Sequence, residues 1–175
     1  MKRLITKRLG RVPKMAASMI NMNVVYDKFK IERLEAFQDN TLKALLKGRD
    51  VYLSVKTGSG KSLCYQAFSS LWRLENIGIC QIVTVTPLVS IMKEQCDFLM
   101  NLGFTATYIG KDDGENSGIL AGQYEFVFTS PESLLGVPMW REMLSNETTR
   151  LLVVDEAHTV LHWYLLICTK YLAVI

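Results

Sequence analysis

The sequence has little that would support a disulfide framework or a zinc site. Its 175 residues include only four cysteines and two histidines. The cysteines form no C-x-x-C pair and have no nearby histidine at a zinc-ligand spacing. They are Cys64, Cys80, Cys96 and Cys168. The sequence therefore predicts reduced thiols in an intracellular protein.

A long apolar run is also missing. The longest, over residues 160–175, is interrupted by His162 and Lys170 and falls short of the roughly 20 residues that a membrane-spanning helix needs. Hydrophobic residues make up 49% of the chain and charged residues 21%, which is an ordinary globular composition. The sequence predicts one soluble domain with a single core and no membrane partner.

Acidic residues are absent from the start of the chain, where the first is Asp27. Six of the 20 Lys and Arg residues precede it, which leaves 14 against 17 Asp and Glu, so the remainder is mildly acidic. Overall charge therefore does not argue for a nucleic-acid partner. We expect residues 1–24 to form a basic, disordered arm. A mitochondrial presequence is the alternative, but Ser18 is the only serine among the first twenty residues.

Beyond the arm, helical and strand patterns alternate along the chain. Helices are predicted over residues 34–46, 63–72 and 88–102, and strands over residues 50–55, 81–86, 105–109, 125–129 and 150–154. Gly48 and Gly103 provide helix ends, and residues 111–117 are predicted to form a polar loop. Continuous apolar strands separated by helices indicate an α/β fold, with a mostly parallel sheet covered by helices on both faces.

A glycine-rich segment joins the first of these strands to the next helix. Its residues are Thr57, Gly58, Ser59, Gly60, Lys61 and Ser62. Glycines leave backbone N–H groups accessible and tolerate positive φ, so such a loop can wrap a polyphosphate at the positive end of a helix. Lys61 would then reach the β- and γ-phosphates, and the Ser62 hydroxyl would bind Mg²⁺. The strict G-x-x-x-x-G-K-[ST] pattern is not met, because Val55 occupies its first glycine position.

A second motif, Asp155-Glu156-Ala157-His158, follows the last predicted strand. At the carboxyl end of that strand Asp155 can hold Mg²⁺ through water, and Glu156 can orient or deprotonate an attacking water. His158 would sense the γ-phosphate or link to neighbouring motifs. Taken singly, Asp155 and Glu156 also fit the acidic start of a helix, and His158 also fits a solvent-facing position. The tetrapeptide and the glycine loop together favour a site for ATP and Mg²⁺.

With these two motifs in this order, the chain resembles superfamily-two helicases of the RecQ type. The loop and its continuation, residues 57–66, are similar to the family's T-G-G-G-K-S-L-C-Y-Q, whose last five residues separate RecQ-like proteins from DEAD-box RNA helicases. Residues 86–95 are similar to S-P-L-x-S-L-M-x-D-Q, and residues 129–132 to A-P-E. The resemblance covers about residues 29–163.

The resemblance implies a RecA-like P-loop domain that binds ATP and Mg²⁺, the first motor domain of a 3′–5′ DNA helicase that couples ATP hydrolysis to unwinding. It implies Lys61, Asp155 and Glu156 as catalytic residues, Gln38 with the loop residues as nucleotide contacts, and Ser62 and Asp155 as magnesium ligands. It further implies single-stranded DNA and duplex junctions as partners, and DNA repair and recombination in a eukaryotic nucleus as the setting. The implied nucleic-acid contacts are Pro87, Ser90, Lys93, Ser130 and Trp163.

The adenine-binding segment departs from the family pattern F-G-Y-x-x-F-R-x-x-Q. When Gln38 is aligned with the final glutamine, Ile31 and Glu35 replace the tyrosine and the arginine. Tyr26 or Phe29 could supply a stacking face instead, although a core role is the preferred interpretation for either. Selection of adenine is therefore less certain than phosphate binding.

The match to the family stops at Trp163. We expect residues 25–163 to form a C-terminally truncated ATP-binding domain and residues 164–175 a divergent apolar tail. Without a second motor domain and its arginine finger, the chain alone should hydrolyse ATP poorly and should not unwind DNA. Two alternatives stay open: a non-catalytic nucleotide- or DNA-binding fragment of a truncated helicase, and a DEAD-box-like RNA remodeller. The sequence does not predict the oligomeric state.

Overall fold

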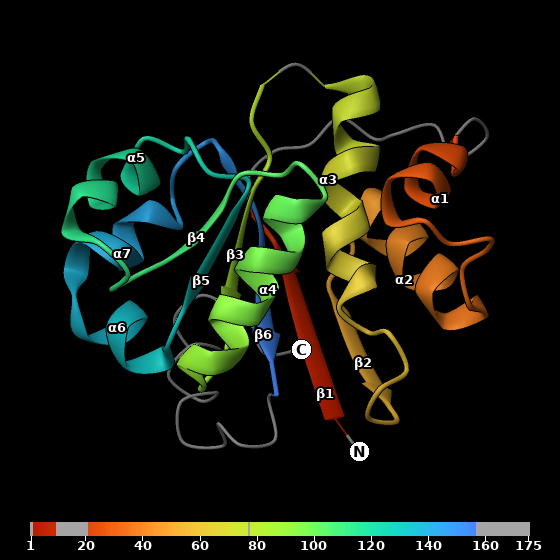
Figure 1. Cartoon of the computed structure of the whole chain (residues 1–175), viewed down its shortest axis with the longest axis horizontal. Helices are drawn as coiled ribbons and strands as arrows, with labels where there is room; N and C mark the ends of the chain where they lie inside the picture. Colours follow the sequence, from red (N-terminus) through yellow and green to blue (C-terminus); the bar gives the residue numbers. More distant parts are fainter. Residues whose placement is uncertain (1, 10–20, 77, 157–175) are drawn as a thin grey trace.

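The computed structural model describes residues 2–9, 21–76 and 78–156. Within them a six-stranded sheet has the order β2-β1-β6-β3-β5-β4 (Figure 1). In chain order the strands are β1 Lys2–Arg8, β2 Val51–Val55, β3 Gln81–Val85, β4 Ala106–Tyr108, β5 Phe126–Thr129 and β6 Thr149–Asp155.

Five of these strands run in one direction, and β1 runs against them. Strand β3 pairs in parallel with both β5 and β6, and β4 pairs in parallel with β5. Strand β1 is antiparallel to β2 on one side and to β6 on the other, so β2 and β6 share a direction. The predicted α/β fold with a mostly parallel sheet is confirmed, with one antiparallel strand that the sequence pattern did not predict.

Strand β1 lies where we expected a disordered arm over residues 1–24, and that interpretation does not hold for residues 2–8. Leu4 and Thr6 are fully buried, and Leu4 pairs with Leu53 on one side and Asp155 on the other. Hydrogen bonds to two neighbouring strands and burial of a β-prone segment offset the entropy lost on ordering it. Residues 10–20 of the expected arm lie outside the described residues.

Helices cover both faces of the sheet (Figure 1). The face on which Leu151 and Val153 lie packs against α1 Asn23–Phe29, α2 Ala36–Leu46, α3 Leu63–Glu75 and α4 Val89–Asn101. The face on which Leu152 and Val154 lie packs against α5 Asn116–Leu120, α6 Pro131–Gly136 and α7 Pro138–Met143. Because alternate strand residues point to opposite faces, β6 contributes to two separate cores.

The helix ends predicted at Gly48 and Gly103 are confirmed, since both glycines have a φ of +77°. The segment predicted as a polar loop, residues 111–117, instead contains the short 3₁₀ helix η1 Asp113–Glu115 and the start of α5. The side chain of Asp112 accepts a hydrogen bond from the backbone N–H of Gly114 and so begins that helical turn.

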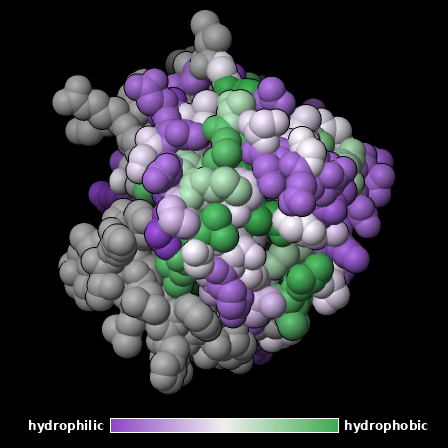
Figure 2. Space-filling model, turned by 90° about the vertical axis from the view of Figure 1, so that its left-hand side faces the viewer, coloured by the Kyte–Doolittle hydropathy of each residue, from purple (hydrophilic) through white to green (hydrophobic). Residues whose placement is uncertain are grey.

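The side of the molecule that carries α5, α6 and α7 has a mixed surface. Figure 2 shows hydrophobic residues interspersed with hydrophilic ones over this side. The exposed apolar side chains there include Val137 and Met139. In the part of the chain that the structure describes, no helix has the length and apolar character that crossing a membrane requires.

Candidate nucleotide site

The segments singled out in the sequence meet at one edge of the sheet. Strands β2, β3, β5 and β6 run in the same direction, and each ends in one of them. The glycine loop follows β2, Pro87 follows β3, Ser130 follows β5, and Asp155 ends β6. Open α/β sheets bind ligands at the carboxyl ends of their strands. The fold therefore brings the predicted motifs to the edge where a ligand is expected.

The glycine loop depends on two backbone conformations that other residues rarely adopt. Gly58 has a φ of +79° and Gly60 a φ of +76°. A Cβ atom on Gly60 would also lie 2.8 Å from Nε2 of Gln38. Any other residue at Gly60 would thus be strained and would collide with its neighbour. Val55, at the first glycine position of the strict pattern, is the last residue of β2 and does not belong to the loop.

Gln38 connects the start of α2 to this loop. Its Oε1 accepts a hydrogen bond of 2.9 Å from the backbone N–H of Glu35, and its Nε2 donates one of 2.9 Å to the carbonyl of Gly60. The residue is 5% exposed. Gln38, predicted as a nucleotide contact, therefore caps a helix and supports the loop, which the sequence did not indicate.

The ammonium group of Lys61 lies between the two acids of the second motif. Its Nζ is 2.5 Å from Oδ1 of Asp155 and 2.9 Å from Oε1 of Glu156. All three residues are less than a tenth exposed. Two carboxylates share one ammonium group, so the cluster has a formal charge of −1 and can accept further cationic charge.

The backbone of Glu156 is held in an uncommon conformation. Its φ is +56°, and its N–H donates a hydrogen bond of 2.8 Å to Oδ1 of Asp155. A non-glycine residue in this region costs on the order of 1–3 kcal/mol, and such residues concentrate at functional sites. The turn keeps the Glu156 carboxylate beside Lys61.

Asp155 and Ser62 fit the donor preference of Mg²⁺, which takes oxygen ligands and usually keeps several waters beside one or two carboxylates and phosphate oxygens. Ser62 is half-buried and precedes α3. Among the described residues no cluster of three or more His, Cys, Asp or Glu could hold a metal by itself. Asp155 and Ser62 would hold a magnesium ion at this edge together with phosphate oxygens and water.

The other ionisable side chains near the start of α3 stay neutral. Burial raises the pKa of the Cys64 thiol to about 12, and burial followed by the negative charge of Asp155 raises the pKa of Tyr65 far above its ordinary value. Neither group can act as a nucleophile or a base near neutral pH. Cys64 and Tyr65 are therefore excluded from the acid–base chemistry of this edge.

The remaining loop residues face outward. Thr57, Gly58 and Gly60 are exposed and Ser59 is half-buried, with the Ser59 hydroxyl donating a hydrogen bond of 2.8 Å to the carbonyl of Lys56. Their exposure at the start of α3 is what binding of an anion from solution requires.

Four of the five predicted nucleic-acid contacts are among the described residues, and Trp163 is not. Ser90 and Lys93 are exposed on the first turns of α4, just after the half-buried Pro87. Ser130 caps α6, where its Oγ accepts a hydrogen bond of 3.1 Å from the backbone N–H of Ser133. These residues therefore share the strand-end edge with the glycine loop. Trp163 and His158 lie outside the described residues.

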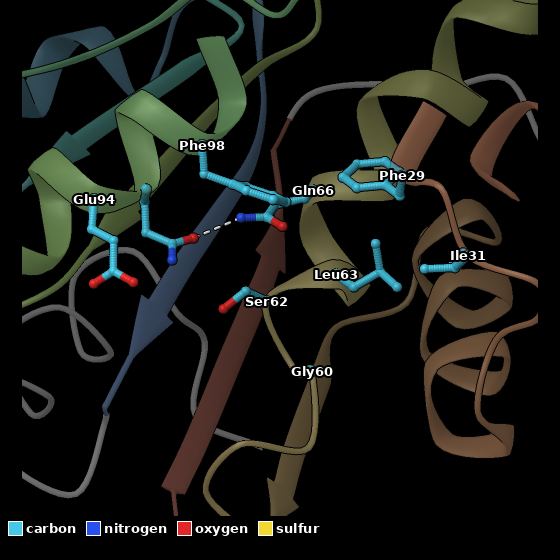
Figure 3. Close-up of a pocket in the computed structure, with 9 residues that line it drawn as sticks. Phe29, Ile31, Gly60, Ser62, Leu63, Gln66, Glu94 and Phe98 are labelled. Atoms are coloured by element: carbon cyan, nitrogen blue, oxygen red, sulfur yellow. Dashed lines mark hydrogen bonds between the residues drawn. The ribbon is translucent and has the colours of Figure 1, made fainter. Parts of the chain in front are cut away.

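A pocket beside the glycine loop was not predicted as a whole (Figure 3). Its volume is about 320 Å³, and its apolar walls come from Phe29, Ile31, Leu63 and Phe98. Phe29 also belongs to the core, where its ring centroid lies 5.9 Å from that of Phe104. The sequence indicated Phe29 as an alternative stacking face. It gave no signal for Phe98, because an exposed aromatic on a helix has no distinctive pattern.

Comparison with known proteins agrees with this geometry. The family model described as DEAD/DEAH box helicase matches residues 35–173. The ATP-dependent DNA helicase RecQ of Bacillus subtilis is 28% identical over 142 residues, which cover 77% of this chain and 23% of that protein. The ATP-dependent helicase SGS1 of Saccharomyces cerevisiae is 29% identical over 153 residues, which cover 80% of this chain and 10% of that protein.

The ATP-dependent DNA helicase Q-like 5 of Arabidopsis thaliana is 31% identical over 150 residues, covering 83% of this chain and 15% of that protein. The chain thus spans about a quarter or less of the length of these relatives. Since the family model covers most of the chain and the relatives align over nearly the same part, the chain belongs to the DEAD/DEAH box helicase family and carries a motor domain like that of RecQ helicases.

Proposed function

We propose that this domain binds ATP together with Mg²⁺ and acts as the first motor domain of a RecQ-like 3′–5′ DNA helicase. The observation that carries the proposal is the contact of Lys61, at the end of the glycine loop, with both Asp155 and Glu156. Lys61 and Asp155 are 94 residues apart in the sequence, and a phosphate-binding site is a physical reason for holding them together.

Binding would exchange one set of anionic partners of Lys61 for another. Backbone N–H groups of the glycine loop and the start of α3 would receive the phosphate oxygens, and Lys61 would turn from the carboxylates to the β- and γ-phosphates. Asp155 and Ser62 would then be available to hold Mg²⁺, which supplies charge neutralisation on the phosphates. Glu156 would orient the attacking water or accept its proton.

DNA is proposed as the nucleic-acid partner. Two of the three relatives named above are called DNA helicases. Exposed Ser90 and Lys93 lie on the same strand-end edge as the glycine loop and can reach phosphates from solution. RNA is the alternative that the experiment below separates from DNA.

Hydrolysis of ATP by the purified chain, with and without single-stranded DNA or RNA, tests the proposal. We expect slow turnover that single-stranded DNA stimulates and that Lys61→Ala abolishes. Lys47→Ala is the matched control, since Lys47 is an exposed lysine at the end of α2. Ser62→Ala serves as a second variant in case Lys61→Ala fails to fold. It changes no charge and should weaken the dependence of turnover on Mg²⁺.

Two outcomes would change the proposal. Nucleotide binding without turnover under any condition would favour a non-catalytic binding domain. Clearly stronger stimulation by RNA than by DNA would contradict the RecQ-like assignment.

A further inference from the structure

The pocket beside the glycine loop is continuous with the proposed phosphate site. Gly60 and Ser62 of the loop lie at its lower side in Figure 3, on either side of Lys61 in the sequence. Phe29 and Ile31 form one wall, and Glu94 and Phe98 of α4 form the opposite wall. A nucleotide whose phosphates contact Lys61 therefore has an adjoining cavity for its base.

The size of the pocket suits a base with part of its sugar. Its volume of about 320 Å³ is at the lower end of the range of roughly 300–1,000 Å³ for small-molecule sites. The walls are mostly apolar, so they can pack against the flat face of a heterocycle.

The amide that reads adenine in the family pattern is committed elsewhere. Gln38, the residue that the family pattern assigns to adenine, does not line the pocket, and both of its amide ends bind backbone groups. Within the pocket, Nε2 of Gln66 donates a hydrogen bond of 2.7 Å to Oε1 of Gln95. Each amide thus uses one group on the other, and Oε1 of Gln66 and Nε2 of Gln95 are outside this bond. One acceptor beside one donor can meet the edge of more than one base.

The apolar wall residues offer no replacement for this readout. Ile31 stands where the family has a tyrosine, and its side chain can neither stack as an aromatic ring nor hydrogen-bond. Glu94 is exposed at the pocket, so water competes for its carboxylate. Apolar pockets discriminate between similar ligands by only about 10–200-fold, whereas sites built on hydrogen bonds reach about 10⁴–10⁵-fold.

We infer that this pocket holds the base of the nucleotide by apolar contact and accepts ATP, GTP, CTP and UTP with little preference. The inference rests on the proposed function, because it needs the triphosphate to bind at Lys61. It adds that the substrate class is nucleoside triphosphates in general, and that the phosphate site contributes most of the selectivity.

Equilibrium binding of the four nucleoside triphosphates and of inorganic triphosphate to the full chain, each with Mg²⁺, tests the inference. We expect the four nucleotides to have dissociation constants within about tenfold of one another. We expect each to bind at least about tenfold more tightly than inorganic triphosphate, because only the nucleotides fill the pocket.

Phe98→Ala should weaken all four nucleotides by a similar factor and leave inorganic triphosphate unchanged. Met100→Ala is the matched control, because Met100 is an apolar residue of the same helix with a similar exposed fraction, 43% against 45% for Phe98, and it does not line the pocket. It should change none of the five dissociation constants.

The outcomes separate the two proposals. A preference for ATP over GTP of more than about tenfold would overturn the inference and leave the phosphate site intact. Equal affinity for inorganic triphosphate and the nucleotides would likewise overturn the role of the pocket. If neither the nucleotides nor inorganic triphosphate bind, the proposed function itself fails.

Discussion

The three charged residues of the nucleotide site are buried, and their burial strengthens the interactions between them. Lys61, Asp155 and Glu156 are each less than a tenth exposed, so their charges are weakly screened and each depends on the others. Removing one partner from a buried ion pair commonly costs about 3–5 kcal/mol, because a charge is left without compensation. For that reason, assays of Lys61 variants need a check of folding beside the check of function.

The buried thiols predict how stability changes with pH. Burial raises the pKa of both Cys64 and Cys96 from 9.0 to about 12. Both groups therefore favour the folded state fully below pH 9, and their contribution is lost as the pH rises from about 9 toward 12. Each thiol should lower the free energy of unfolding by up to about 1.4 kcal/mol per pH unit in that window.

Urea unfolding at pH 7.5, 9 and 10.5 measures this effect, with Cys64→Ala/Cys96→Ala as the comparison. The double variant should lose less stability between pH 9 and 10.5 than the unchanged chain. Identical slopes for the two proteins would show that the thiols are not buried as described.

At the scale of elements, the sequence predicted the strands and helix ends that a local residue pattern determines. The strands after residue 50 are apolar runs of ordinary length, and positive φ at Gly48 and Gly103 ends two helices as expected. The helices α5, α6 and α7 have five or six residues each, too few to establish a helical period. Strand β1 was missed because its partners β2 and β6 are far away in the sequence.

Strand β1 separates β2 and β6, the two strands that carry the nucleotide motifs. A substitution at Leu4 tests this placement of β1. Leu4 is 0% exposed and packs in the same core as α1, α2, α3 and α4. We expect Leu4→Ala to lower the free energy of unfolding by about 2–5 kcal/mol, as for other buried leucines. Leu74→Ala, at a leucine that is 47% exposed, should change it little. Urea unfolding compares the two, and equal stability of both variants would contradict the placement of β1.

At the scale of the whole molecule, parallel strands account for how much of the site could be predicted. Because four strands end at one edge, the meeting of Lys61 with Asp155 and Glu156 followed from the motifs and the fold class. The backbone role of Gln38 and the pocket wall from Phe98 did not follow, because both depend on side-chain contacts between separate helices and loops.

The sheet order also separates two functions along this edge. The glycine loop and the acids follow β2 and β6, and the proposed DNA contacts follow β3 and β5. We expect Lys93→Glu to weaken binding of single-stranded DNA and to reduce its salt dependence by about one phosphate contact, with little change in ATP affinity. Lys47→Glu, at the exposed lysine that follows α2, is the control. Titration of DNA at several salt concentrations measures this, and unchanged slopes would remove Lys93 from the DNA contacts.

The central claim is that the glycine loop and the acid pair form a binding site for ATP and Mg²⁺. Isothermal titration of ATP into the purified chain, with and without Mg²⁺, tests it most directly. We predict one ATP per chain, tighter binding with Mg²⁺, a smaller magnesium effect in Ser62→Ala, and at least about tenfold weaker binding in a folded Lys61→Ala variant. Absence of saturable binding by the unchanged chain, or equal affinity of the unchanged chain and Lys61→Ala, would contradict the claim.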